Sequence, residues 1–197
     1  MVPSQPPGAA AAKLAFRDQL STARNRLTLT EIGLFARAVA GHLLDTDEVR
    51  RAATVAAYVS IGTEPGTTWL LDGLAAAGKR VLLPVLLPDG DLDWAVHTGD
   101  SDLAPARFGL LEPTSRRLGV DAVGTADVVL VPGLAVTSSG MRLGRGGGSY
   151  DRALGRVPIG TFTCAILYDG EVGVAVPVEP HDRPVTAAVT PSRVHRF

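Results

Sequence analysis

The chain has 197 residues, of which 46% are hydrophobic and 20% charged, and its formal net charge is -1. This length and composition suit one globular domain with a substantial buried core, and the charge gives no indication of a nucleic-acid or membrane partner. The lone cysteine, Cys164, excludes an internal disulfide and a zinc site built from cysteines. Its apolar surroundings favour a buried, inert thiol over a reactive nucleophile.

No stretch approaches the roughly 20 apolar residues that a membrane-spanning helix needs. Residues 1–12 lack the basic segment and apolar core of a signal peptide. We therefore expect a cytoplasmic protein, and we expect a monomer. Pro, Gly and Ser dominate residues 1–8, which are predicted to form a disordered tail, and residues 9–197 are predicted to form a single α/β domain.

Four segments favour helix. Residues 9–26 are rich in Ala, Leu, Arg and Lys, which are good helix formers. Residues 30–44 have two candidate N-caps, Thr28 and Thr30. Residues 67–77 end at Gly78, a usual helix stop, and residues 149–154 begin a helix after a glycine-rich loop. The apolar residues of the second helix recur at helical spacing: Ile32, Phe35, Val39 and Leu43.

Short apolar runs between these helices are typical of strands, and residues 91–97 alternate as a more exposed edge strand would. The order of elements predicts a Rossmann-like, three-layer α/β fold, with a mostly parallel sheet and helices on both faces. Such sheets bind ligands beyond the carboxyl ends of their strands, so the loops after Ser60 and Pro132 are candidate sites. The predicted strands are residues 54–60, 80–84, 91–97, 127–132, 161–167 and 185–190.

The segment richest in chemistry is residues 140–152, which contains five glycines and three arginines. Glycines let main-chain N–H groups approach an anion, and the forks of Arg142 and Arg145 fit phosphate oxygens. A helix that begins near Ser149 would point further donors at the same place. The loop has no lysine and is not a Walker A motif. A flexible surface loop is the alternative, but the charged flanks after a buried strand favour an anion site.

Residues 142–151, Arg-Leu-Gly-Arg-Gly-Gly-Gly-Ser-Tyr-Asp, resemble the signature loop of 5-formyltetrahydrofolate cyclo-ligases. Ser149 stands where that family usually has tyrosine. Other motifs of the family occur in the same order along this chain, from about Lys13 to Thr190. They are the Lys13–Arg17 pair, residues 58–64 with the substrate glutamate Glu64, the Phe108-Gly-Leu-Leu-Glu-Pro113 turn, the Asp127–Gly133 strand, and the His181–Asp182 pair.

The resemblance implies a fold of the NagB/RpiA/CoA-transferase type and an ATP-dependent ligase. In the implied reaction, ATP phosphorylates the formyl oxygen on N5 of the folate, N10 attacks the activated carbon, and phosphate leaves. Such a transfer depends mainly on positioning and charge neutralisation. The implied small-molecule substrates are ATP and a reduced folate, with Mg²⁺ as cofactor.

The resemblance also implies roles for individual residues. Lys13 and Arg145 are the implied catalytic residues, and the carboxylates of Asp151 and Asp182 are the implied ligands of Mg²⁺. The implied ATP-binding residues are Lys13, Arg17, Arg142, Leu143, Gly144, Arg145, Gly146, Gly147, Gly148, Ser149 and Tyr150. The implied substrate-binding residues are Val59, Glu64, Trp94, Arg145, Gly146, Gly147, Gly148 and Ser149.

The residues alone leave simpler interpretations open. Asp151 could cap the helix at Ser149, and Asp182 could shape a turn between two prolines. His181 is more often a loop histidine than a ligand. Tyr150 could stack on a ring of the ligand or serve as a buried structural tyrosine. Lys13 and Arg17 lie one turn apart on a helix, where a solvated charged face is common.

Two other functions compete with the ligase. The departure at Ser149 motivates a folate- or nucleotide-binding homologue with reduced or lost turnover. A sugar-phosphate isomerase or regulator on a similar sheet could use the same arginines to hold a sugar phosphate, since one fold hosts many functions. The ordered set of motifs argues against the isomerase.

Overall fold

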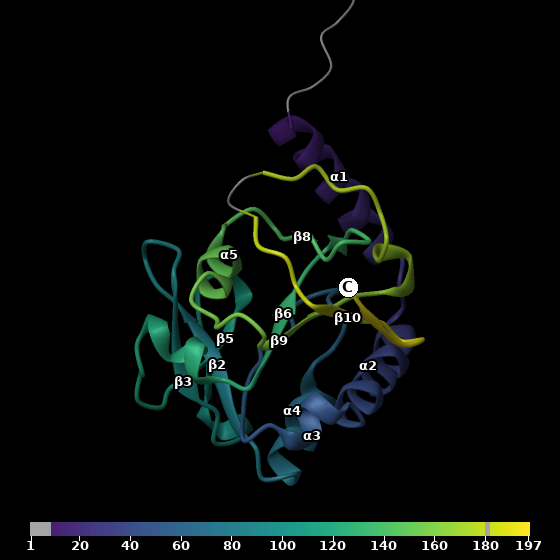
Figure 1. The fold of residues 1–197 in the computed structure, drawn as a ribbon. Helices are drawn as coiled ribbons and strands as arrows, with labels where there is room; N and C mark the ends of the chain where they lie inside the picture. The colour runs from purple at the N-terminus through teal and green to yellow at the C-terminus, as the bar shows by residue number, and fades with distance from the viewer. Residues whose placement is uncertain (1–8, 180–181) are drawn as a thin grey trace, which may run out of the picture.

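A computed structural model describes residues 9–179 and 182–197, and a seven-stranded sheet forms its centre (Figure 1). The strands lie in the order β11-β10-β9-β6-β1-β2-β3. The inner strands run parallel, and the edge strands β3 and β11 run antiparallel to their neighbours. The bounds are β1 Thr54–Ala56, β2 Arg80–Leu86, β3 Leu92–Val96, β6 Val128–Pro132, β9 Phe162–Ile166, β10 Ala187–Val189 and β11 Val194–Arg196.

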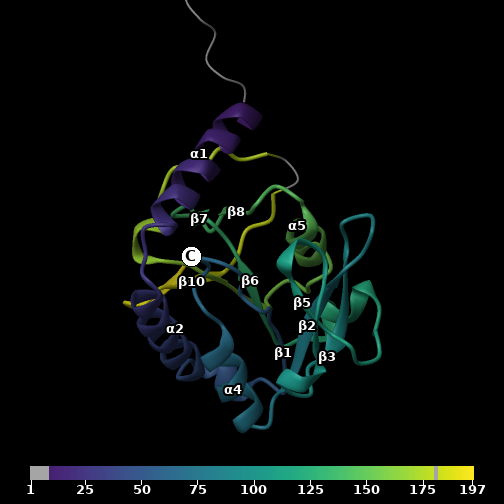
Figure 2. The same cartoon turned by 180° about the vertical axis from the view of Figure 1, so that it is seen from behind.

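Helices cover both faces of the sheet, because its inner strands are apolar on both sides. Consecutive strand residues such as Val55 and Ala56 belong to different core clusters. The first cluster packs against α2 (Leu29–Leu44), α3 (Asp47–Arg51) and α4 (Thr68–Ala76). The second packs against α5 (Ser149–Leu154) and the 3₁₀ helix Val120–Thr125. Figure 2 shows α2 and α4 on one side and α5 on the other. The predicted three-layer α/β fold is confirmed.

Local signals set two helix boundaries as the sequence predicts. Thr28, one of the two proposed caps, forms a capping box with Glu31: its hydroxyl accepts from the Glu31 N–H at 3.2 Å, and its own N–H donates to the Glu31 carboxylate at 2.8 Å. Gly78 follows α4 with φ of +69°, a conformation that favours glycine.

A reciprocal pair of hydrogen bonds closes the loop between β1 and α4. The Ser60 N–H donates to the Thr67 hydroxyl at 2.9 Å, and the Thr67 N–H donates to the Ser60 hydroxyl at 3.0 Å. The pair fixes the ends of the loop that carries Glu64. Strand β1 ends at Ala56, whereas the sequence predicts a strand as far as residue 60.

Several short elements were not predicted. They are α3, β11, two hairpins and the 3₁₀ helices. Strands of two or three residues are too short for an alternating pattern to reveal them. The hairpin strands are β4 Leu103–Pro105 with β5 Leu111–Pro113, and β7 Ala135–Val136 with β8 Arg142–Leu143.

Helix α1 (Ala9–Arg24) lies apart from α2, α3 and α4 (Figure 1). Its residues Phe16 and Leu20 pack against a third apolar cluster, formed by Leu134, Ala135 and Leu143. Its last residue, Arg24, is buried and pairs with Glu171 through two hydrogen bonds of 2.7 Å. The same guanidinium donates to the Gly133 carbonyl at 2.7 Å. Apolar packing and one buried ion pair therefore fix α1 beside the end of β6.

Cys164 is fully buried in the first core cluster, and burial raises the pKa of its thiol, as expected of an inert cysteine. In the described part of the chain, no single helix is long and apolar enough to cross a membrane. Ala11–Arg24 and Leu29–Leu44 pass that test only when taken together, and they meet at a bend of 104°. Residues 1–8, the predicted tail, lie outside the described residues.

Breaking the Arg24–Glu171 pair by removing one partner should be strongly destabilising. We expect Glu171→Ala to lower the free energy of unfolding by about 3–5 kcal/mol in urea titrations, because it leaves a buried guanidinium without a counter-charge. Arg51→Ala is the control, since the Arg51–Asp47 pair is exposed and its loss should cost less than about 1 kcal/mol. Equal losses in the two variants would contradict the assignment.

Candidate active site

A cavity of about 810 Å³ opens beyond the carboxyl ends of β1, β2 and β6. Open α/β sheets bind ligands in this position, and the volume is typical of a small-molecule site. Segments far apart in the sequence line it: α1, the loop after β1, the β4–β5 hairpin, the loop from β8 to α5, and residues near Asp182.

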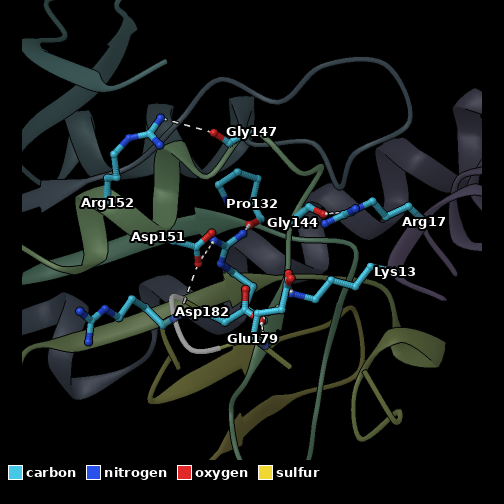
Figure 3. A network of polar contacts seen from close by, with 11 residues as sticks. Lys13, Arg17, Pro132, Gly144, Gly147, Asp151, Arg152, Glu179 and Asp182 are labelled. Carbon is cyan, nitrogen blue, oxygen red and sulfur yellow. Dashed lines mark hydrogen bonds and ion pairs between the residues drawn. The ribbon is translucent and has the colours of Figure 1, made fainter. Parts of the chain in front are cut away.

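The glycine loop, residues 144–148, joins β8 to α5. Gly146 and Gly148 have φ of +103° and +70°, where a side chain would be strained. The guanidinium of Arg17 lies directly against Gly146, 3.3 Å from where a Cβ would stand. Its Nε also donates to the Gly144 carbonyl at 2.9 Å (Figure 3). Because these glycines have no side chains, the Arg17 side chain of α1 can lie directly against the backbone of the loop and hold it.

Arg142 is a buried link between β6 and α5. Its Nη1 donates to the Pro132 carbonyl at 3.2 Å, and its Nη2 donates to the Asp151 carboxylate at 3.0 Å. A Cβ at Gly144 would stand 2.6 Å from the Arg142 Nη1, so a larger residue there would require the Arg142 guanidinium to shift. Asp151 thus pairs with an arginine, and Gly148 is the residue at the N-cap of α5, so the capping alternative for Asp151 is not what the structure shows.

Arg145 and Glu64 join the glycine loop to the loop after β1. The Arg145 Nε donates to the Glu64 Oε1 at 3.1 Å, and the Ile61 N–H donates to the Glu64 Oε2 at 3.0 Å. The Arg145 side chain is 56% exposed, whereas that of Glu64 is 7% exposed. The carboxylate is therefore fixed in the cavity wall, and the guanidinium is the partner that is free to move.

Lys13 lies between two carboxylates, as Figure 3 shows. Its ammonium is 2.6 Å from the Glu179 Oε2 and 2.7 Å from the Asp182 Oδ2. Burial lowers the pKa of Lys13, but the hydrogen bonds to Asp182 and Glu179 outweigh burial and leave the pKa raised. Lys13 is consequently a charged group inside the cavity, and the alternative of a solvated helix face does not apply to it.

The two carboxylates proposed for a metal lie on the same wall. Asp151 and Asp182 both line the cavity, and the Arg183 N–H, one residue beyond Asp182, contacts the Asp151 Oδ1 at 3.4 Å. Among the described residues, no group of three His, Cys, Asp or Glu side chains forms a metal site. Two carboxylates suit Mg²⁺, which takes its other ligands from water and phosphate. His181 lies outside the described residues.

Comparison with known proteins identifies the family. A sequence model described as the 5-formyltetrahydrofolate cyclo-ligase family matches residues 9–191. The chain belongs to this family. The resemblance predicted from residues 142–151 is thus confirmed, and the family favours the ligase over a sugar-phosphate isomerase.

Individual relatives agree with the family match. The chain is 45% identical to a 5-formyltetrahydrofolate cyclo-ligase of Mycolicibacterium smegmatis over 145 residues, which are 71% of this chain and 74% of the relative. It is 34% identical to that of Escherichia coli strain K12 over 174 residues, which are 87% and 96% of the two chains. The NMR structure of an Aquifex aeolicus 5,10-methenyltetrahydrofolate synthetase aligns with a TM-score of 0.81 and 28% identity over 93% of this chain and 92% of that one.

The cavity of this cyclo-ligase family member brings together all but one of the predicted site residues, and their individual roles stay predictions. The lining residues from that set are Lys13, Arg17, Val59, Glu64, Arg142, Leu143, Gly144, Arg145, Gly146, Gly147, Gly148, Ser149, Tyr150, Asp151 and Asp182. Val59 also packs against the first core cluster, and burial raises the pKa of Tyr150 well above its usual range.

Trp94 is the exception, and its predicted place in the pocket is wrong. It is fully buried in the second core cluster and does not line the cavity. Leu92 lies on the same face of β3 and does line the cavity, so the cause is depth along the strand: Trp94 lies two residues further from the strand end at which the cavity opens. Position along the chain does not reveal this depth.

Sequence reasoning missed much of the apolar wall. Phe108 lines the cavity and is 74% exposed. Among the described residues that are not glycine, it alone has a positive φ, of +59°. Such strain tends to gather at functional sites. The motif Phe108–Pro113 was recognised as a turn, but not as a source of lining side chains. The other missed residues are Tyr58, Ile61, Pro84, Leu86, Gly90, Leu92, Leu110, Leu111, Glu112, Pro132, Gly133 and Glu179.

The turn between β2 and β3 is fixed to α5 and the segment after it. Arg156 forms a two-pronged ion pair with Asp91 at 2.9 and 2.5 Å, and Arg152 donates to the Gly90 carbonyl at 2.5 Å. Gly90 and Leu92 both line the cavity. These contacts therefore hold one wall of the cavity against the segment that follows the glycine loop.

The Asp91–Arg156 pair predicts a pH-dependent stability. The hydrogen bonds from Arg156 lower the pKa of Asp91 more than burial raises it, so the ionised carboxylate stabilises the folded state. Asp91→Asn should cost about 1–2 kcal/mol at pH 7. A carboxylate with a lowered pKa stabilises the folded state above its unfolded-state pKa, and this contribution is lost as the pH falls. The difference in unfolding free energy between Asp91→Asn and wild type should therefore shrink below about pH 4. Denaturant titrations at several pH values measure this, and a constant difference would contradict it.

Proposed function

We propose that the chain catalyses the ATP-dependent cyclisation of 5-formyltetrahydrofolate to 5,10-methenyltetrahydrofolate, with release of ADP and phosphate. The observation that carries this proposal is one cavity in which the glycine loop, with Arg145 on it and Arg142 on the preceding strand, faces a fixed carboxylate from another loop. The first arrangement suits a polyphosphate, and the second suits the N–H groups of a pterin. Membership of the cyclo-ligase family supports the same reaction.

The reaction needs activation because an amide-like oxygen is a poor leaving group. The γ-phosphoryl group of ATP is transferred to the formyl oxygen on N5, and ADP is released. The N10 lone pair then attacks the formyl carbon, the oxygen leaves with phosphate, and N10 loses its proton. The protein contributes orientation and charge, since phosphoryl transfer requires little covalent work from side chains.

Four cations line the cavity and are proposed to face the phosphates: Lys13, Arg17, Arg142 and Arg145. Arg145, on the glycine loop, is more exposed than Arg142 on β8, and its contact with Glu64 is a single hydrogen bond. In the proposed complex it turns toward the transferred phosphoryl group. Glu64 then accepts hydrogen bonds from the pterin, and Val59 packs against the ring.

Asp151 and Asp182 are the proposed holders of Mg²⁺. The ion would supply charge neutralisation for the phosphates of the nucleotide. Both carboxylates lie on the cavity wall, and each already contacts a cation, Arg142 or Lys13. A second cation is thus accommodated when the polyphosphate adds its own negative charge and draws Lys13 away from Asp182.

A single assay tests the function. The protein is mixed with ATP, magnesium and 5-formyltetrahydrofolate, and the near-ultraviolet absorbance of the methenyl product is followed together with ATP consumption. We expect product and ADP in equal amounts. Folate binding without product would indicate the binding homologue that Ser149 motivates. Absence of folate binding would contradict the proposal and favour a different small molecule.

The metal assignment has its own prediction. Asp151→Asn and Asp182→Asn should each lower turnover at limiting magnesium by about tenfold or more, with a smaller effect on thermal unfolding. Asp72→Asn, an exposed carboxylate on α4 outside the cavity, is the control. Binding of Mn²⁺ with a non-hydrolysable ATP analogue, followed by its paramagnetic signal, should weaken in parallel. Unchanged turnover in both variants would refute the assignment.

A further inference from the structure

The side chain of Tyr58 combines burial, a cavity position and an unused polar group. The residue follows β1, is 3% exposed, and lines the cavity. Within the described residues its hydroxyl has no hydrogen-bond partner, although it is shielded from solvent. Burying a hydroxyl without a partner costs free energy that phenylalanine in the same place would avoid. Core packing alone therefore does not account for tyrosine at this position.

Its surroundings indicate what the hydroxyl can contact. Arg145 and the Ile61 N–H already occupy the two oxygens of Glu64, which lies in the same cavity wall. Another tyrosine of this region behaves differently: the Tyr168 hydroxyl donates to the Thr63 carbonyl at 3.1 Å. The Tyr58 hydroxyl is thus a buried polar group without a partner among the described residues, and the negative charge of Glu64 acts on it.

The protonation state of Tyr58 favours donation. Burial, and after it the negative charge of Glu64, raises the pKa of Tyr58 well above its usual range. The phenol therefore stays neutral and keeps its proton throughout the physiological range. A neutral donor suits an uncharged heterocycle with carbonyl and amino groups better than it suits a phosphate, for which the cavity has arginines.

We propose that the Tyr58 hydroxyl is a recognition group that hydrogen-bonds the polar edge of the reduced pterin next to Glu64. The inference rests on the proposed function and deepens it by assigning a further contact to the folate half of the cavity. Buried polar groups that lack a partner in the free protein are a usual source of specificity, because the ligand that satisfies them is favoured over one that cannot. Tyr58 acts in binding and has no role in the transfer of the phosphoryl group.

The variant Tyr58→Phe tests the proposal. We expect the Kd for 5-formyltetrahydrofolate, measured calorimetrically without nucleotide, to rise about tenfold, and the KM to rise with it while kcat changes little. The Kd for ATP should stay as in wild type. The unfolding temperature should stay equal or rise, because the change removes an unsatisfied hydroxyl. The affinity for folate should thus fall in Tyr58→Phe without a loss of thermal stability.

Tyr168→Phe is the matched control for stability. It removes a tyrosine hydroxyl that has a partner, so its unfolding temperature should fall. An unchanged folate Kd in Tyr58→Phe would overturn the proposal, and so would an equal loss of ATP binding or a fall in unfolding temperature like that of Tyr168→Phe. These failures differ from failure of the proposed function, which would appear as the absence of folate binding or product in the wild-type protein.

Discussion

The carboxyl end of β6 is held by two buried guanidinium groups, and the geometry of the cavity depends on them. Arg142 binds the Pro132 carbonyl and Arg24 binds the Gly133 carbonyl, so the chain leaves the sheet in one direction. Each arginine needs an acidic partner, because a buried charge without one is costly. Asp151 comes from α5, and Glu171 follows β9. The same contacts that satisfy two charges therefore fix α1 and α5 on opposite sides of the cavity.

The cations that line the cavity already have partners within the protein. Lys13 contacts two carboxylates, Arg17 a carbonyl, Arg142 a carboxylate and a carbonyl, and Arg145 a carboxylate. In the proposed reaction, substrate binding exchanges one set of ionic contacts for another. Such an exchange requires less desolvation than creating charge contacts anew, since the charges are already partly removed from water. In that proposal Arg145 is the cation that moves, because it is the more exposed member of its pair with Glu64.

The sequence predicted the layers and the helix boundaries well, because these depend on local chemistry. The Thr28 capping box and the stop at Gly78 involve neighbours in the chain, and the apolar runs of β6 and β9 reflect burial on both faces. The short hairpins and α3 escaped prediction because they are too short for periodicity to reveal them, although local contacts support α3: Thr46 caps it, and Asp47 pairs with Arg51. The buried Arg24–Glu171 pair joins residues 147 positions apart, and no local pattern marks it.

The aromatic residues show where residue type alone fails. Trp94 and Phe108 both precede the Glu-Pro turn, and an apolar ring at either could line a pocket. Trp94 is buried in the second core cluster, whereas Phe108 lies in the turn between β4 and β5 and is exposed at the cavity. Tyr58 combines the two roles: it belongs to the first core cluster and also lines the cavity. The face of the strand does not decide this alone, because Leu92 shares the face of Trp94 and lines the cavity. The distance of a residue from the strand end at which the cavity opens decides whether it serves the core, the cavity or both.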